Sequence, residues 1–209
     1  MPEMPEPTSI EVLAERFAVF LVDQFGVLLD GKMPYPGAAG ALRYLKDQGS
    51  TVIILSNSGR AGQYNADRLA KLGIAPELYD RMVTSGDVAF ELVANGAVGF
   101  PSARGTRCLT ISSGNDTNLS QRLDFVEVTS ATEAEVVVIS GSRGTELSVY
   151  AELLRPAAAR QVPAICTNPD IHMLTGSGIA PGAGAIARLY EELGGVVRWF
   201  GKPYADIYQ

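Results

Sequence analysis

Long apolar runs alternate along this chain with amphipathic stretches, and most of the runs stop at glycine or polar residues. FAVFLV (17–22) and TVIIL (51–55) are continuous runs, which are typical of strands buried on both faces of a parallel sheet. The stretches 37–49 and 62–73 look helical, and each closes on a glycine. Strand, helix, strand and helix within about sixty residues predict a parallel α/β sheet with right-handed crossovers.

The same alternation begins again near residue 85. The elements expected there, in chain order, are a helix at 87–96, strands at 106–112, 124–129 and 135–140, a helix at 147–160 and a strand at 163–167. After a glycine-rich joint at 179–185, a helix at 186–195 and a strand at 196–200 resemble the first unit. We therefore predict a Rossmann-like core at 1–84 and 181–209, interrupted by an inserted α/β domain at 85–180.

The composition of the chain indicates which partners it is expected to bind and in which cellular compartment it is expected to lie. The chain has 209 residues, 46% hydrophobic, and a net charge of −6 without a Lys/Arg cluster, which argues against nucleic acid. The two cysteines, Cys108 and Cys166, lack metal-ligand spacing, which favours a reducing compartment and ordinary buried thiols. The N-terminal residues lack the pattern of a signal peptide, and no apolar stretch reaches membrane-spanning length. A cytoplasmic protein without a membrane partner is expected.

Polar residues follow three strands that we expect in the core. Asp23 ends the first, Ser56 and Asn57 follow the second, and Lys202 follows the last. Because ligands of open parallel sheets bind beyond the carboxyl ends of the strands, these groups should converge on one edge. A carboxylate can attack phosphorus, a hydroxyl and backbone N–H groups can hold phosphate oxygens, and an ammonium can neutralise both anions. Each feature alone is more often a turn or a helix cap, so their order and common placement carry the hypothesis.

The stretches DQFGVLLDG, YPGAAGALRYLKDQGSTVIILSNS, TNPD, PGAGA and GKPY, in this order, resemble the haloacid dehalogenase (HAD) superfamily. The closest branch is class IIA, the NagD-like sugar- and nucleotide-phosphatase group with a C2-type cap. The resemblance implies that Asp23 is the nucleophile and Lys202 the lysine of the third motif. It also implies that Ser56 is the hydroxyl of the second motif, with Asn57 and Ser58 beside it at the phosphate.

The resemblance assigns the insert at about 85–180 to the cap, which closes over the site and selects the substrate. Asn168 and Asp170 of TNPD would lie on a cap loop that faces the site. Mg²⁺ is the implied cofactor, held by Asp23 and by the backbone carbonyl of Phe25. The implied partner is a small phosphorylated metabolite, a sugar phosphate or a nucleotide, and such caps often pair subunits into a homodimer.

Phe25 departs from the pattern of the family's phosphatases, in which this residue is a second aspartate that protonates the leaving alcohol and then activates water. General acid–base help is worth about 10²–10⁴-fold, so phosphatase activity should be weak unless another group substitutes. Asp30, five residues further on, is one candidate, on sequence proximity alone.

The family's fourth motif, an acidic loop that completes the Mg²⁺ site, should follow GKPY after another helix and strand, but the sequence ends at Gln209. Either a longer chain is expected, or the core lacks its last strands. Two rival functions therefore stay open. One is a phospho-ligand- or partner-binding domain without catalysis. The other is a carbon-attacking dehalogenase or phosphonatase-like hydrolase, since such enzymes lack an acid at the position of Phe25.

Three further features have plainer interpretations. Residues 182–187 match the GxGxxA dinucleotide fingerprint, but the preceding TGSGIAP is a poor strand, so we interpret the glycines as the joint between cap and core. His172, the sole histidine, is expected to make a polar contact in a cap loop. The polar run 112–118 is expected to be a solvated turn.

Overall fold

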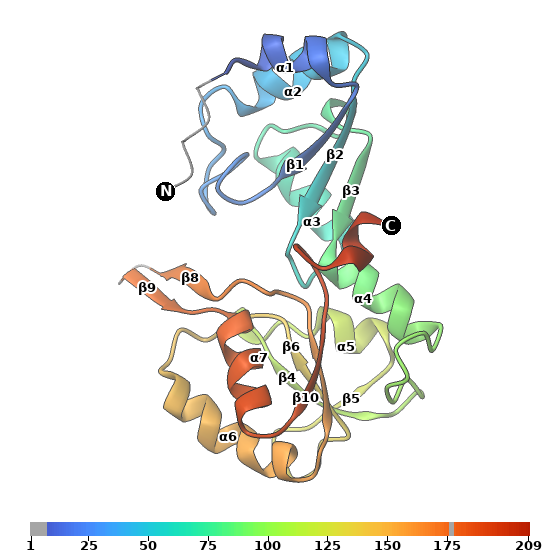
Figure 1. Cartoon of the computed structure of the whole chain (residues 1–209), viewed down its shortest axis with the longest axis vertical. Helices are drawn as coiled ribbons and strands as arrows, with labels where there is room; N and C mark the ends of the chain where they lie inside the picture. Colours follow the sequence, from blue (N-terminus) through green and yellow to red (C-terminus); the bar gives the residue numbers. More distant parts are fainter. Residues whose placement is uncertain (1–7, 176–177) are drawn as a thin grey trace. The chain divides into compact units, whose positions relative to one another are not determined.

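The computed structural model describes residues 8–175 and 178–209, which divide into two compact units (Figure 1). The first comprises the described residues up to Ser56 together with Gln63–Val83, and the second comprises Asn57–Gly62 together with Thr84–Gln209. Each unit has its own sheet, and both sheets are parallel. The expected parallel α/β fold is therefore confirmed, and each unit is described by itself below.

The first unit contains a sheet in the order β1-β2-β3. Its elements are α1 (Ile10–Arg16), β1 (Val19–Asp23), α2 (Ala38–Asp47), β2 (Thr51–Ser56), α3 (Gly62–Lys71), the 3₁₀ turn η1 (Pro76–Leu78) and β3 (Arg81–Thr84). Ser9 caps α1 by accepting the N–H of Val12 with its hydroxyl oxygen. Leu42 and Leu45 of α2 pack with Val52 and Ile54 of β2 in one buried cluster.

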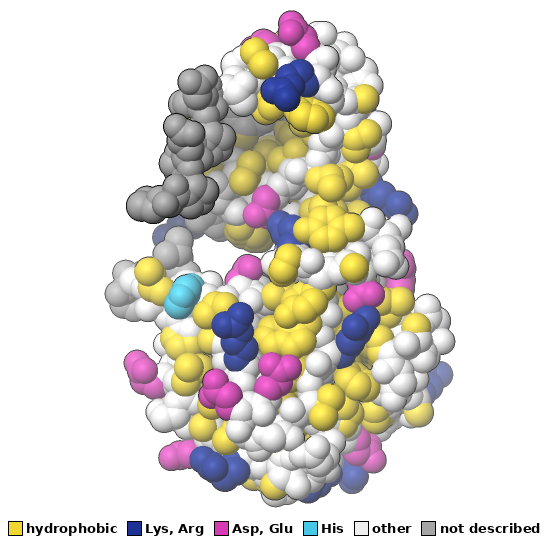
Figure 2. All heavy atoms as spheres, viewed as in Figure 1, with side chains coloured by type: hydrophobic (Ala, Val, Ile, Leu, Met, Phe, Trp, Pro, Cys, Tyr) yellow, Lys and Arg dark blue, Asp and Glu magenta, His cyan; other side chains and the backbone are white. Residues whose placement is uncertain are grey.

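The strand β1 is less buried than its unbroken apolar sequence predicts. Val19 and Leu21 are 56% and 55% exposed, while Phe20 and Val22 between them pack against the core of the first unit. Within the described residues β1 pairs only with β2, so one edge and one face of this strand lack a neighbour. Apolar side chains accordingly show on the surface of this unit in Figure 2. The expectation of burial on both faces is wrong for β1.

The second unit is a three-layer sandwich around five parallel strands in the order β10-β7-β6-β4-β5. Its strands are β4 (Arg107–Ile111), β5 (Val126–Glu127), β6 (Val136–Ile139), β7 (Pro163–Cys166) and β10 (Val196–Trp199), and a separate antiparallel hairpin joins β8 (His172–Thr175) to β9 (Gly178–Pro181). Its helices are α4 (Ser85–Ala94), α5 (Asn118–Arg122), α6 (Leu147–Ala159) and α7 (Ala183–Glu192), with 3₁₀ turns η2 (Ser113–Asn115) and η3 (Ala205–Tyr208). Counted along the chain, this strand order is 2-1-3-4-5, a common doubly wound arrangement.

Alternating residues of these strands fill two separate cores. Val137 and Ile139 share a buried cluster with residues of α6 and α7, while Val136 and Val138 share another with residues of α4 and α5. The continuous apolar run of β6 is therefore buried on both faces, as its sequence predicts. Both cysteines are free and buried, and burial raises the pKa of each thiol to about 12, which fits the prediction of ordinary buried thiols.

Two expectations about the C-terminal residues are wrong. The strand β10 does not join the sheet of β1 and β2, because its backbone pairs in register with β7 of the second unit. The glycine-rich stretch 179–185 is not a joint between units either, since β9 and α7 on its two sides both belong to the second unit. The segment 181–209 therefore completes the second unit, and only the described residues up to and including Val83, apart from 57–62, build the first.

Candidate functional site

The carboxylate and the hydroxyl predicted for catalysis lie at neighbouring strand ends in the first unit. Asp23 is the last residue of β1 and is paired in register with Leu55, so that Ser56 follows directly on the neighbouring strand. Asp23 is exposed, and its Oδ1 accepts the N–H of Gln24 at 2.7 Å. Ser56 is fully buried. The sheet edge of this unit therefore presents an accessible carboxylate one register position from a buried hydroxyl.

The segment after Asp23 is anchored to the first core and carries Phe25 on its outer side. Leu28 and Leu29 are buried, and Gly26 donates its N–H to the carbonyl of Leu29 at 2.8 Å. Phe25 is 42% exposed, and the guanidinium of Arg68 lies 5.5 Å from the centroid of its ring. Such a cation–π contact is worth about 0.5–1 kcal/mol at an exposed site. The aromatic ring thus has a packing partner of its own.

Asp30 is poorly suited to replace the missing acid. Its Oδ1 accepts the N–H groups of Lys32 and Met33, both at 2.8 Å, and so closes its own turn. These backbone hydrogen bonds, first that of Met33, lower the pKa of Asp30 below its ordinary value. A general acid needs a raised pKa, so the structure gives Asp30 a structural task rather than the proton transfer considered above.

Gln24, beside the candidate nucleophile, is a residue that the sequence interpretation missed. Its side chain is fully buried, and among the described residues neither its Oε1 nor its Nε2 has a hydrogen-bond partner. A buried amide without partners is costly, since its desolvation is not compensated. The signal in the sequence was a polar residue that directly follows an apolar strand.

The other predicted site residues gather in the second unit, around the side chain of Asn57. The amide of Asn57 contacts the main chain of Lys202 and the carboxylate of Asp170. Asp170 in turn donates its N–H to Oδ1 of Asn168 at 3.0 Å, which shapes the TNPD loop after β7. The structure therefore brings Asn57, Asn168, Asp170 and Lys202 together in one unit, and Asp23 and Ser56 together in the other.

The loop 57–62 is fastened to the second unit by side chains that sequence reasoning did not single out. Arg60 pairs with Asp116 at 2.6 Å, Ala61 donates to Asn118, and Gly62 donates to Asp87. The polar run 112–118 is therefore more than a solvated turn. Ser58 is held as well, because its carbonyl accepts the N–H of Gly86 at 3.0 Å and the hydroxyl of Ser85 at 2.9 Å.

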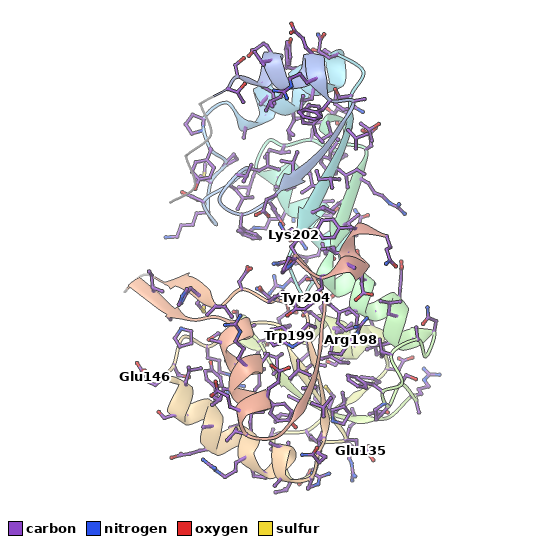
Figure 3. All side chains as sticks on the ribbon, viewed as in Figure 1. Glu135, Glu146, Arg198, Trp199, Lys202 and Tyr204 are labelled. Atoms are coloured by element: carbon purple, nitrogen blue, oxygen red, sulfur yellow. The ribbon has the colours of Figure 1, made fainter. Side chains whose placement is uncertain are left out.

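Lys202 lies in a turn after β10 that two stacked aromatic side chains stabilise. The rings of Trp199 and Tyr204 stack with their centroids 5.8 Å apart, and the indole N–H of Trp199 donates to Glu191 (Figure 3). Tyr204 donates its N–H to the carbonyl of Gly201 across the turn. The GKPY motif therefore forms a turn at the end of β10 that is held by both side-chain and main-chain contacts.

The fingerprint-like glycines serve packing. A Cβ on Gly182 would lie 2.2 Å from the carbonyl oxygen of Asp170, and one on Gly184 would lie 2.1 Å from that of Pro169. The strand β9 before them pairs only with β8, in an antiparallel hairpin, whereas a dinucleotide fingerprint follows a parallel strand. His172, at the start of β8, is exposed (Figure 2). No group of three or more His, Cys, Asp or Glu side chains within residues 8–175 and 178–209 is placed to hold a metal.

A sequence profile described as haloacid dehalogenase-like hydrolase matches residues 20–126, just over half of the chain. The chain belongs to the haloacid dehalogenase-like hydrolase family. Within this HAD family, a crystal structure of a hydrolase from Brucella suis 1330 is 33% identical with a TM-score of 0.82, covering 97% of this chain and 75% of that one.

Two further relatives of this HAD chain carry phosphatase names. A glycerol phosphate phosphatase from Mycobacterium tuberculosis, solved with magnesium, is 25% identical with a TM-score of 0.67, over 93% of this chain and 58% of that one. A 4-nitrophenylphosphatase of Schizosaccharomyces pombe is 30% identical over 77 residues, which are 36% of this chain. The chain spans 26% of the length of this curated relative. The HAD resemblance noted in the sequence is thus confirmed.

Among the described residues, no helix is long and apolar enough to cross a bilayer.

Proposed function

We propose that this HAD protein hydrolyses the phosphomonoester of a small metabolite, a sugar phosphate or a nucleotide, through an aspartyl phosphate on Asp23. The observation that carries the proposal is the pairing of β1 with β2, which sets Asp23 beside Ser56 at the carboxyl end of the sheet. Family membership supports it, as do the phosphatase names of two relatives.

In the first step, a carboxylate oxygen of Asp23 forms a bond to phosphorus while the bond from phosphorus to the ester oxygen breaks. The Ser56 hydroxyl and the N–H groups of Asn57 and Ser58 would hold the phosphate oxygens. The ammonium of Lys202 would offset the negative charge that accumulates between carboxylate and phosphate. In the second step, water attacks the acyl phosphate, which releases phosphate and restores Asp23.

Proton transfer is the weak part of this cycle. The leaving alkoxide needs a proton in the first step, and the attacking water must lose one in the second. Phe25 can supply neither, and the carboxylate of Asp30 is engaged in its own turn. We therefore propose slow turnover, with the leaving group protonated by solvent and the acyl phosphate on Asp23 long-lived.

The residues at this edge fit Mg²⁺ through oxygen ligands. The carboxylate of Asp23 is exposed, and the backbone carbonyl of Phe25 offers a second oxygen, while Mg²⁺ keeps several waters in sites with few protein ligands. The bound ion would neutralise charge on the phosphoryl oxygens. A magnesium complex is known for one of the relatives above.

A second candidate function is the binding of a phosphorylated ligand without turnover. The contact between Phe25 and Arg68 favours it, because the position of the usual acid is taken by a ring that is packed against a cation. Both functions use Asp23 and Lys202, but only the first requires a bond to form at Asp23.

The deciding experiment is phosphate release from 4-nitrophenyl phosphate with Mg²⁺, for the wild type, Asp23→Asn and Asp30→Asn. We expect slow release by the wild type, none by Asp23→Asn, and an unchanged rate for Asp30→Asn, which serves as the matched carboxylate control. Release that persists in Asp23→Asn contradicts the proposal. Binding of inorganic phosphate without any release by the wild type favours the second function.

A further inference from the structure

The side chain of Asn57 binds both main-chain polar groups of Lys202. The N–H of Lys202 donates to Oδ1 of Asn57 at 2.7 Å, and Nδ2 of Asn57 donates to the carbonyl of Lys202 at 3.2 Å. Two hydrogen bonds between one amide and one residue fix the rotation of that residue as well as its distance. The place from which the Lys202 side chain departs is therefore set by Asn57.

The amide of Asn57 has no donor left for a phosphate. It carries two N–H groups, one directed to the carbonyl of Lys202 and the other to Oδ1 of Asp170 at 3.0 Å. Its oxygen is an acceptor and would repel a phosphate oxygen. A direct phosphate contact by this side chain, as expected from the sequence, is thus disfavoured, and only the main-chain N–H of Asn57 remains for that role.

The surroundings of the turn leave Lys202 little freedom to shift. Gly201 has φ +98°, and a Cβ there would lie 2.7 Å from Oδ1 of Asn57 and 3.0 Å from Cβ of Ser85. On the outer side, the stacked rings of Trp199 and Tyr204 hold the turn (Figure 3). Contacts from two sides therefore define the backbone from which the Lys202 side chain departs.

We propose that Asn57 is a positioning residue for Lys202, placing its ammonium where it meets the phosphoryl group. This inference rests on the proposed function, since it assigns Lys202 to the phosphate. It predicts that loss of Asn57 acts only through Lys202. It also gives a physical reason why an asparagine directly follows Ser56, because the amide of Asn57 links the loop after Ser56 to the turn at Lys202.

The first test follows the Lys202 amide itself by hydrogen exchange at single-residue resolution. In Asn57→Ala this amide should exchange at least about tenfold faster than in the wild type, which corresponds to the net worth of one hydrogen bond. The control is Asn95→Ala, which removes a side-chain hydrogen bond to the N–H of Ala97 in the same unit and none to Lys202. Unchanged exchange at Lys202 overturns the inference.

Asn57→Ser covers the case in which the alanine variant does not fold. Its hydroxyl lies one bond closer to the backbone than the amide oxygen of Asn57, so it cannot replace the contact with the Lys202 N–H. The Lys202 amide should therefore also exchange faster in Asn57→Ser, and unchanged exchange would overturn the inference.

The second test is a double-mutant cycle on the affinity for inorganic phosphate, measured by calorimetry with Asn57→Ala and Lys202→Met. Asn57→Ala should weaken binding about tenfold in the wild-type background and by less than about twofold when Lys202 is already methionine. Equal losses in both backgrounds would mean that Asn57 acts independently of Lys202, which overturns the inference.

The two proposals fail in different ways. If Asp23→Asn abolishes phosphate release while the cycle is additive, the function stands and the positioning role falls. If the wild type neither binds nor releases phosphate, the proposed function falls, and with it the phosphate-directed role of Asn57. The exchange experiment then decides the Asn57–Lys202 contact alone.

Discussion

Phe25 is the residue at which this chain departs from what hydrolysis of a phosphate ester requires. A carboxylate at this position could take a proton from the water that frees Asp23 in the second step, whereas the phenyl ring instead packs against Arg68. We predict that Phe25→Asp raises the rate of phosphate release from 4-nitrophenyl phosphate by about 10²-fold or more, the low end of the range for general acid–base help. Phe25→Leu, which removes the ring and adds no acid, should give no increase. An equal rise in both variants would show that access, and not proton transfer, limits turnover.

The buried amide of Gln24 is expected to lower the stability of the protein. This amide has no hydrogen-bond partner in the part of the chain that the structure describes, so Gln24→Met, which is close in shape, should raise the free energy of unfolding by about 1–3 kcal/mol. Denaturant unfolding of the two proteins measures the change. A loss of stability in Gln24→Met would instead show that the amide is satisfied in solution, for example by water.

At the scale of elements, the start of α4 depends on the absence of a side chain. A Cβ on Gly86 would lie 2.2 Å from the carbonyl oxygen of Gly59, in the loop that follows Asn57 and Ser58. Glycine inside a helix usually costs about 0.5–1 kcal/mol relative to alanine, so Gly40→Ala in α2, where nothing lies within 4 Å, should stabilise the protein by that amount. Gly86→Ala should have the opposite sign, and thermal unfolding of both variants checks this. Equal gains would refute the close approach of the two segments.

The connection between η1 and β3 contains an ion pair whose contribution to stability depends on pH. Asp80 pairs with Lys46 at 2.6 Å and accepts the N–H of Val52, and these contacts lower its pKa below the ordinary 3.8. Because the folded-state pKa is lowered, the stabilisation is complete above the unfolded-state pKa and is lost as the pH falls through the folded-state value. Asp80→Asn should thus lower the melting temperature at pH 7, and the difference from wild type should shrink below pH of about 4. The exposed Glu77→Gln serves as control, and a difference that is constant with pH contradicts the assignment.

Which elements form could be predicted from the sequence, but which sheet each strand joins could not. The runs that became β2, β6 and β7 are apolar and end at turn residues, and these features are local. The placement of β10 depends on its register with β7, and nothing in the residues 196–200 distinguishes one parallel partner from another. Lys202 was correctly placed at a strand end but assigned to the wrong sheet for this reason.

Among the site residues, too, some contacts could be predicted from the sequence and others could not. Asp23 and Ser56 are neighbours because β1 and β2 are consecutive parallel strands, which the sequence order implies. The contact of Asn57 with Lys202 joins residues 145 positions apart, and the pair of Arg60 with Asp116 joins residues 56 apart. Such contacts depend on the packing of loops, for which short polar sequences contain no periodic signal.

At the scale of the whole molecule, stability is divided between separate cores. Among the described residues, the cluster around Leu45 lies in the first unit, and the clusters around Leu154 and Val138 lie in the second. We predict that Leu45→Ala and Leu154→Ala each cost about 2–5 kcal/mol and speed amide exchange mainly within the altered unit. Hydrogen exchange resolved by residue measures this. Uniform acceleration across both units in either variant would indicate a single cooperative structure.

The boundary between Ser56 and Asn57 has a practical consequence for recombining domains of this family. If the second unit were exchanged between relatives at a junction near Thr84, the loop 57–62 would stay behind and would meet a foreign surface. The exchanged unit would then lack Arg60 and the N–H of Ala61, which bind Asp116 and Asn118. The turn that carries Lys202 would also meet the loop of another protein in place of Asn57. Crossovers placed directly after Ser56 and after Gly62, in addition to that junction, would transfer the loop together with the surface on which it rests.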